Sequence, residues 1–133
     1  MTHYRYYPDS KSFDVFIDNL PGYPDNIRLG SNGTLWVPLP AIRSEYDNWF
    51  AVRPKLRSLL TMLLSSHSIH YFAQWMAPKY GFVLKMDSES GMLLESLHDR
   101  TGHISDVTVA VEDGHGNLLM GSDTQYYIAR LKL

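Results

Sequence analysis

The stretch that decides the fold is Leu20–Val37, LPGYPDNIRLGSNGTLWV. Two short runs, DNIRL and TLWVPL, flank Ser31-Asn32-Gly33, and an Asn-Gly pair supplies the positive φ angles that a tight hairpin turn requires. The stretch is therefore predicted to form a β-hairpin. It also carries Asp25 and Asn26 at the mouth of the hairpin, and residues of these two types either turn the chain or bind a hard cation.

Similar hairpin signals recur along the chain. Runs rich in β-branched and aromatic residues, separated by turn residues, predict hairpins over 3–20, 82–97 and 107–122 and a lone last strand over 125–133. Together with the first stretch they predict nine short strands joined as a meander. The fold class is therefore expected to be all-β with one interruption.

That interruption is a segment with helical spacing between the second and third hairpins. Pro54 suits a first helical position, Pro78 is expected to stop the helix, and a break is expected near Ser65 and Ser66. We expect a helical insertion over about 45–79. Its apolar face consists of leucines at positions i, i+3, i+4, i+7 and i+8, namely Leu56, Leu59, Leu60, Leu63 and Leu64.

A faint repeat points to the architecture. GTLWV at 33–37 recurs as GNLLM at 116–120, an offset of 83 residues, and removal of the irregular and helical segment 43–80 leaves 45 residues. A four-stranded propeller blade occupies about 40–45 residues. The strands suffice for little more than two blades, whereas a propeller needs at least about four to close. We therefore expect the C-terminal part of a longer protein, whose open edge strands must be covered by missing blades or by a partner chain.

Composition excludes several classes of function. The chain has 133 residues, of which 44% are hydrophobic and 20% charged, which is the balance of a globular domain with one modest core. A net charge of −2 without long runs of one sign gives no case for nucleic-acid binding. The absence of cysteine excludes disulfides, thiolate nucleophiles and cysteine-based zinc sites. The first residues contain no apolar core of signal-peptide length, and no run of about 18 apolar residues occurs.

The meander sorts the connections into two groups. Alternate connections between consecutive antiparallel strands lie at the same end of a sheet. One end collects the four short turns, and the other collects the longer loops 21–26, 98–105 and 121–124 together with the insertion. Functional sites gather on longer loops held by a rigid scaffold, so the second end is the predicted functional face.

Asp25 and Asn26 lie on this predicted functional face. A carboxylate beside a carboxamide offers hard oxygen donors, which suit Ca²⁺. Two residues cannot complete a shell of about six to eight ligands, so the other ligands would come from other blades. A turn in which Asp or Asn bonds its own backbone is the commoner role of such a pair, and on the residues alone both readings remain open.

Three runs of sequence resemble a known family. FIDNLPGYPDNIRLGSNGTLWV, SEYDNWFAVRPKLRSLLTMLLS, and SLHDRTGHISDV with NLLMGS resemble the strictosidine synthase-like family, most closely its animal branch. This family is similar in architecture to paraoxonases and gluconolactonases, which are six-bladed propellers with a central calcium site. The resemblance implies that the chain is the C-terminal portion, about two and a half blades, of such a propeller. It also implies missing N-terminal blades and an anchor, with a membrane-anchored or endomembrane location for the full-length protein.

The resemblance gives Asp25 and Asn26 a role. The Asp-Asn-Ile of 25–27 resembles the paraoxonase motif in which the Asp and Asn bind calcium, and a bound metal can polarise an ester or lactone carbonyl. The matching offset in the next inner hairpin carries Thr108 and Val109, so blade geometry alone does not demand the pair. The implied function is a calcium-dependent, arylesterase-like hydrolase of small esters or lactones, active when the propeller is complete. The alternative is a non-catalytic propeller that binds a partner or lipid.

Asp106 is the candidate catalytic residue. Strictosidine synthases use a glutamate on the innermost strand of the last blade as the general base for condensing an amine with an aldehyde, and the aligned position here is Asp106. Aspartate is one methylene shorter, which counts against the same reaction because a general base must reach its proton. An ordinary carboxylate at a strand start, facing water, is the other reading of Asp106.

The histidines and a glycosylation sequon are weaker candidates. His67 and His70 have helical spacing but no visible third metal ligand. His98 and His103 flank a loop on the functional face, where either could carry protons, although hydrogen-bonded loop histidines are commoner. Asn32-Gly33-Thr34 is an N-glycosylation sequon as well as a turn.

The insertion has three readings. Basic residues precede its leucine-rich face and large aromatic residues follow it, which is typical of a segment that lies on a membrane surface. The contact would run through 53–77. The segment could instead cap the site as an apolar lid, or pack as a helix on the rim of the propeller.

Overall fold

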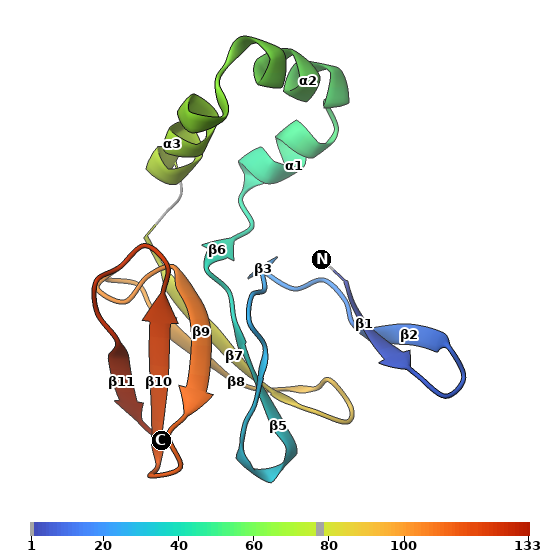
Figure 1. The fold of residues 1–133 in the computed structure, drawn as a ribbon, viewed down its shortest axis with the longest axis vertical. Helices are drawn as coiled ribbons and strands as arrows, with labels where there is room; N and C mark the ends of the chain where they lie inside the picture. The colour runs from blue at the N-terminus through green and yellow to red at the C-terminus, as the bar shows by residue number, and fades with distance from the viewer. Residues whose placement is uncertain (1, 77–78) are drawn as a thin grey trace. The chain divides into compact units, whose positions relative to one another are not determined.

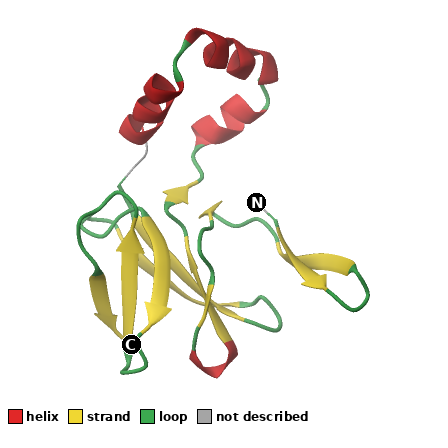
Figure 2. Cartoon of the chain, viewed as in Figure 1, coloured by secondary structure: helices red, strands yellow, loops and turns green. Residues whose placement is uncertain are grey.

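The computed structural model of this chain describes residues 2–76 and 79–133. The chain divides into a β unit, Met1–Ile42 with Lys79–Leu133, and a helical unit, Arg43–Pro78. All three α-helices belong to the helical unit, and all the strands of the described residues belong to the β unit (Figures 1 and 2). The prediction of an all-β chain with helices in one segment is confirmed at this level.

The N-terminal hairpin consists of β1 (His3–Tyr7) and β2 (Ser12–Ile17), which pair antiparallel. The Arg5 guanidinium attaches this hairpin to the turn between β7 (Gly81–Asp87) and β8 (Leu93–Asp99). It donates hydrogen bonds from Nη2 to the carbonyl oxygens of Ser88 and Glu89, at 2.6 and 2.7 Å, and lies over the Phe16 ring.

The largest sheet has four antiparallel strands in the order β4-β5-β7-β8. β4 (Arg28–Leu29) and β5 (Thr34–Pro38) form the hairpin predicted from Leu20–Val37, and the 3-10 turn η1 (Ser31–Gly33) joins them. Asn32 and Gly33 have φ angles of 54° and 68°, as an Asn-Gly turn requires. The segment 43–78 leaves the β unit between β5 and β7, which nevertheless pair directly with each other.

The second sheet has three antiparallel strands in the order β11-β10-β9. Their bounds are Val107–Glu112 for β9, Asn117–Ser122 for β10 and Ala129–Lys132 for β11. The last strand begins four residues later than predicted, because Thr124 and Gln125 turn back and hydrogen-bond toward Asp106. A further short pair, β3 (Gly22–Tyr23) with β6 (Ala41–Ile42), was not expected, so the described residues form eleven strands rather than nine.

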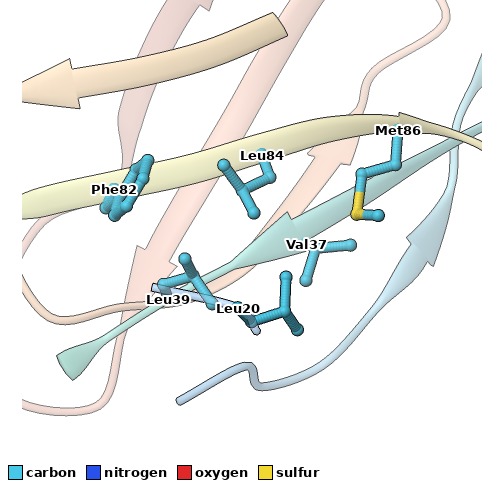
Figure 3. Close-up of a cluster of buried hydrophobic side chains, with 6 residues drawn as sticks. All are labelled: Leu20, Val37, Leu39, Phe82, Leu84 and Met86. Carbon is cyan, nitrogen blue, oxygen red and sulfur yellow. The ribbon is translucent and has the colours of Figure 1, made fainter. Parts of the chain in front are cut away.

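The two central strands of the four-stranded sheet, β5 and β7, bury side chains on both of its faces, since successive side chains of a strand point to opposite faces. One face packs with Leu20 in a cluster shown in Figure 3. The other face packs against the second sheet. The first cluster contains Leu20, Val37, Leu39, Phe82, Leu84 and Met86, and the second contains Trp36, Val83, Val107, Ala110, Leu118 and Met120.

The connections of the β unit separate into two ends. The turn η1 and the β7–β8 and β9–β10 turns lie at one end of the sheets, and the β8–β9 and β10–β11 loops lie at the other (Figure 1). For these five connections this is the arrangement predicted from the meander. The loop after β8 packs closely on the start of β7, since a Cβ on Gly81 would lie 2.2 Å from the Ile104 carbonyl oxygen.

The helical unit contains α1 (Glu45–Ala51), α2 (Pro54–Leu63) and α3 (Ser66–Met76). Ser44 and Asp47 form a capping box at the start of α1. The helix predicted from Pro54 begins there and is interrupted at Leu64, whose backbone is extended with ψ 141°. Pro78, its predicted stop, lies outside the described residues. None of the helices in the described part of the chain is long and apolar enough to cross a membrane.

Candidate functional site

Asp25 and Asn26 lie in the connection between β3 and β4, just before the hairpin. The Asp25 N–H donates to the Pro38 carbonyl oxygen at 3.0 Å, which fixes this connection to the end of β5. The Asp25 carboxylate accepts the Asn26 N–H at Oδ1 with a distance of 2.9 Å. Asp25 is half-buried and Asn26 is exposed. The pair therefore makes the local turn that the sequence allows.

The side-chain oxygens of this pair also meet part of what a hard cation requires of its ligands. Within residues 2–76 and 79–133, Oδ2 of Asp25 accepts no hydrogen bond and the Asn26 side chain makes none. These atoms are oxygen donors of the kind that Ca²⁺ takes. The same residues contain no group of three or more His, Cys, Asp or Glu side chains that could hold a metal. Asp25 and Asn26 thus fit as two ligands of a shell whose other members must come from elsewhere.

Asp106 lies at the end of the β8–β9 loop, directly before β9, with a left-handed φ of 51°. Its half-buried carboxylate is not simply solvated. Thr124, on the loop after β10, donates its hydroxyl to Oδ2 at 2.9 Å, and the Gln125 amide lies at 3.5 Å from the same oxygen. The buried Ser105 hydroxyl is also 3.5 Å from Oδ2. These contacts therefore orient the Asp106 carboxylate, which connects the β8–β9 loop to the β10–β11 loop at one end of the sheets.

The rest of the β8–β9 loop is organised by Asp99. Its carboxylate accepts the Thr101 hydroxyl at 2.6 Å, the Ile104 N–H at 2.7 Å and the Thr101 N–H at 2.8 Å. These hydrogen bonds, led by that of the hydroxyl, lower the pKa of Asp99 to about 2. His103 Nδ1 lies 2.7 Å from the Thr101 hydroxyl, and the His103 carbonyl accepts the Tyr127 hydroxyl. His103 is thus a hydrogen-bonded loop residue.

His98 lies on the outer strand β8 beside a groove. Its Nδ1 is 2.7 Å from the Tyr80 hydroxyl, its Nε2 is 3.0 Å from the Ser96 hydroxyl, and its ring stacks on Phe82 at 4.3 Å. The groove, of about 250 Å³, is lined mainly by apolar residues of both sheets, with Arg130 at its edge. Three neighbouring side chains hold His98 in place. His98 belongs to no metal-binding group of three or more His, Cys, Asp or Glu side chains in the described part of the chain.

The remaining sequence candidates are the two histidines of α3 and the glycosylation sequon. His67 and His70 are both exposed on α3, and no third ligand joins them among the described residues. Asn32 is exposed in η1, and Thr34 of its sequon is buried with its hydroxyl bonded to the Ser31 carbonyl at 2.8 Å.

Sequence reasoning missed Glu112. Its carboxylate accepts the Trp36 indole N–H at 2.7 Å and the Ser31 N–H at 2.9 Å, and these bonds, the indole first, lower its pKa. Glu112 of β9 therefore ties the second sheet to the hairpin turn of the first. Gly30 makes room for it, because a Cβ there would lie 2.7 Å from Oε1 of Glu112. A glutamate at a strand end, 76 residues from its partner tryptophan, carries no local signal of such a bond.

The chain is similar in sequence to several known proteins. No protein-family model matches the chain, and no solved structure matches it significantly. The chain is 37% identical over 124 residues to the adipocyte plasma membrane-associated protein of Bos taurus and 33% identical over 124 residues to that of Homo sapiens. It is 34% identical over 116 residues to the protein strictosidine synthase-like 10 of Arabidopsis thaliana.

These alignments cover most of this chain and a minor part of each relative. They include 90%, 90% and 86% of the chain but only 29%, 29% and 30% of the three relatives. The chain therefore spans less than a third of the length of the curated proteins it matches.

Proposed function

Because this chain belongs to the strictosidine synthase-like family, on the branch of the adipocyte plasma membrane-associated proteins, we propose that it supplies part of a calcium-dependent hydrolase of small esters or lactones. The arylesterase-like active site would lie at the end of the sheets that carries Asp25 and Asp106. Because the chain covers 29% of its relatives, the activity is assigned to the full-length protein.

The architecture we propose is the last two and a half blades, approximately, of a six-bladed propeller. Its support is a four-stranded antiparallel meander packed face to face on three further strands. The repeat also supports it. Gly33 and Gly116, with φ angles of 68° and 82°, each end a hairpin turn just before the second strand of a sheet.

The first and last strands of the chain are open edges in this architecture. Among the described residues β1 pairs only with β2, and β11 pairs only with β10. Unpaired backbone groups of an edge strand need a neighbouring strand or a cover. We assign this role to N-terminal blades or to a partner chain. The names of the two animal relatives associate them with the plasma membrane, and we propose the same location for the full-length protein.

The observation that carries the catalytic proposal is that two carboxylates lie at the same end of the sheets. Asp25 is fixed to the end of β5 through Pro38, and Asp106 is fixed between the β8–β9 and β10–β11 loops through Thr124. Oδ2 of Asp25 and the side-chain oxygen of Asn26 would be two calcium ligands. A bound calcium ion supplies Lewis-acid polarisation of a carbonyl group.

We assign Asp106 as the proton acceptor for the attacking water. The Thr124 hydroxyl holds the carboxylate in one orientation, which a general base needs in order to meet its proton at hydrogen-bond distance. This role differs from the amine–aldehyde condensation of strictosidine synthases. An aspartate in place of glutamate, tied to a neighbouring loop, disfavours that third function.

The test uses the full-length protein and phenyl acetate as the probe. We expect calcium-dependent hydrolysis that Asp25→Ala lowers at least about a hundredfold, because both the metal and its carbonyl polarisation are lost. Calcium affinity measured by calorimetry should fall in the same variant. The matched control is Glu95→Ala, which removes an exposed carboxylate from β8. Unchanged hydrolysis and calcium affinity in Asp25→Ala would overturn the proposal.

A non-catalytic propeller that binds a partner or lipid is the second candidate. It is favoured by the Asp25 carboxylate closing its own turn on the Asn26 N–H, and by the lack of a three-residue metal cluster in the described chain. Full-length protein that binds no calcium and hydrolyses no ester at any calcium concentration would select this candidate.

A further inference from the structure

The helical unit exposes two apolar stripes. On α2, Leu59, Met62 and Leu63 fall at i, i+3 and i+4, so they share one face. Their exposed fractions are 51%, 80% and 71%. On α3, Tyr71, Phe72 and Trp75 share a face in the same way, with exposed fractions of 69%, 53% and 75%. Large apolar side chains gathered at this exposure mark an interaction surface rather than ordinary scatter.

The charge around these stripes has one sign. From residue 48 to residue 78 there are three basic residues and no acidic residue, which gives +3, while the remaining nine basic and fourteen acidic residues of the chain give −5. The basic residues Arg53, Lys55 and Arg57 lie at the start of α2 and are all exposed. The apolar surface is therefore paired with positive charge in a chain that is otherwise negative.

The residue types in the stripes indicate that they bind a lipid surface rather than a groove on another protein. Trp and Tyr concentrate where one part of a ring lies in an apolar medium and another part in water, which is the boundary of a bilayer. Helices with basic residues on one side and Trp, Phe or Leu on the other lie flat at this boundary. We propose that α2 and α3 dock the β unit onto an anionic membrane surface, with Leu59, Met62, Leu63 and the α3 aromatic residues entering the lipid and Lys55 and Arg57 meeting the headgroups.

The test measures binding of the whole chain to vesicles by sedimentation. Vesicles contain phosphatidylcholine alone or with about 30% phosphatidylserine, whose negative charge attracts basic segments. We expect binding to the anionic vesicles that weakens as salt is raised. The emission of Trp75 should shift to the blue and be quenched by brominated lipid, whereas Trp36, fully buried in the second core cluster, should not respond.

Two double variants separate the contributions. Lys55→Gln with Arg57→Gln should weaken binding to anionic vesicles about thirtyfold, since each basic residue near the surface contributes about fivefold. Met62→Ser with Leu63→Ser should weaken it at least about tenfold through lost apolar burial. Neither pair makes a side-chain hydrogen bond within the described residues, so the fold should survive, as far-ultraviolet circular dichroism would show.

Two matched control variants remove side chains of the same types from the β unit. Lys11→Gln with Lys132→Gln removes two exposed charges, and Tyr126→Ser with Ile128→Ser removes two exposed apolar side chains. Both controls should bind vesicles like the parent chain. Equal weakening by test and control variants, equal binding to neutral and anionic vesicles, or no binding at all would overturn the proposal. So would a protein partner that captures the helical unit while the chain ignores vesicles.

Discussion

At the scale of single residues, Asp99 makes the β8–β9 loop sensitive to acid. Its pKa is lowered from 3.8 to about 2 by hydrogen bonds from Thr101 and Ile104. A group whose pKa is depressed by folding stabilises the native state above its unfolded pKa, and this contribution is lost as the pH falls through the folded value. The loop should therefore lose stability between about pH 4 and pH 2.

The prediction is checked by thermal unfolding of the parent chain and of Asp99→Asn across this pH range. The melting temperature of the parent should fall more steeply than that of the variant, because the amide cannot lose a charge by protonation. Other acidic side chains titrate in both proteins, so only the difference between the two slopes reports on Asp99. Parallel slopes would contradict the assignment.

Glu112 is a second single residue that is expected to stabilise the fold. Its two hydrogen bonds, to the Trp36 indole and the Ser31 N–H, join sheets that are distant in sequence. Glu112→Gln keeps the shape but turns one acceptor into a donor, so one of the two N–H groups loses its partner. We expect about 1–2 kcal/mol less free energy of unfolding. Urea denaturation with Glu95→Gln as an exposed control measures this, and an unchanged midpoint would show that the bond contributes nothing.

At the scale of elements, the position of the candidate site depends on how closely the β8–β9 loop packs against β7. Gly81 permits this approach, because a Cβ there would lie 2.2 Å from the Ile104 carbonyl oxygen. Gly81→Ala should push the loop away and cost about 1–3 kcal/mol in free energy of unfolding. At Gly121 an added Cβ meets the movable Val109 side chain at 3.0 Å instead of a backbone atom. Gly121→Ala should therefore cost less, and equal midpoints for the two variants in urea would contradict the loop contact.

The elements also show which features a sequence can predict. Asn32-Gly33 predicted the hairpin because a positive φ is a local requirement of the turn, and the leucine spacing predicted α2 for a similar local reason. The pair β3–β6 was missed because two-residue strands have no periodicity, although the pair continues the register of the β4–β5 hairpin.

Some features of the candidate site could likewise be predicted from the sequence, and others could not. Asp25 and Asn26 were identified from residue type and loop position, and their turn was one of the two expected roles. The Thr124 bond that orients Asp106 was not predicted, because it joins loops 18 residues apart through side chains alone. Metal binding stays a prediction, since two oxygen donors on one loop fit both a turn and an incomplete calcium shell.

At the scale of the whole molecule, the two units should be separable. Both hydrophobic clusters and their partly buried neighbours consist entirely of residues of the β unit. Replacing residues 43–78 by a Gly/Ser linker of about six residues should therefore leave both cores intact, since closing a short loop between paired strands costs little. The shortened chain should unfold cooperatively, with a melting temperature within about 5 °C of the parent.

The same shortened chain tests the assignment of membrane binding to the helical unit. It should lose vesicle binding while keeping the strand signal in circular dichroism, because the exposed apolar stripes and the basic residues Arg53, Lys55 and Arg57 leave together with the segment. The parent chain with four of the six stripe residues, Leu59, Met62, Leu63 and Trp75, changed to Ser should bind vesicles as weakly as the shortened chain. Retained binding in either protein would place the membrane contact on the β unit instead. Loss of cooperative unfolding would show that the helices stabilise the sheets.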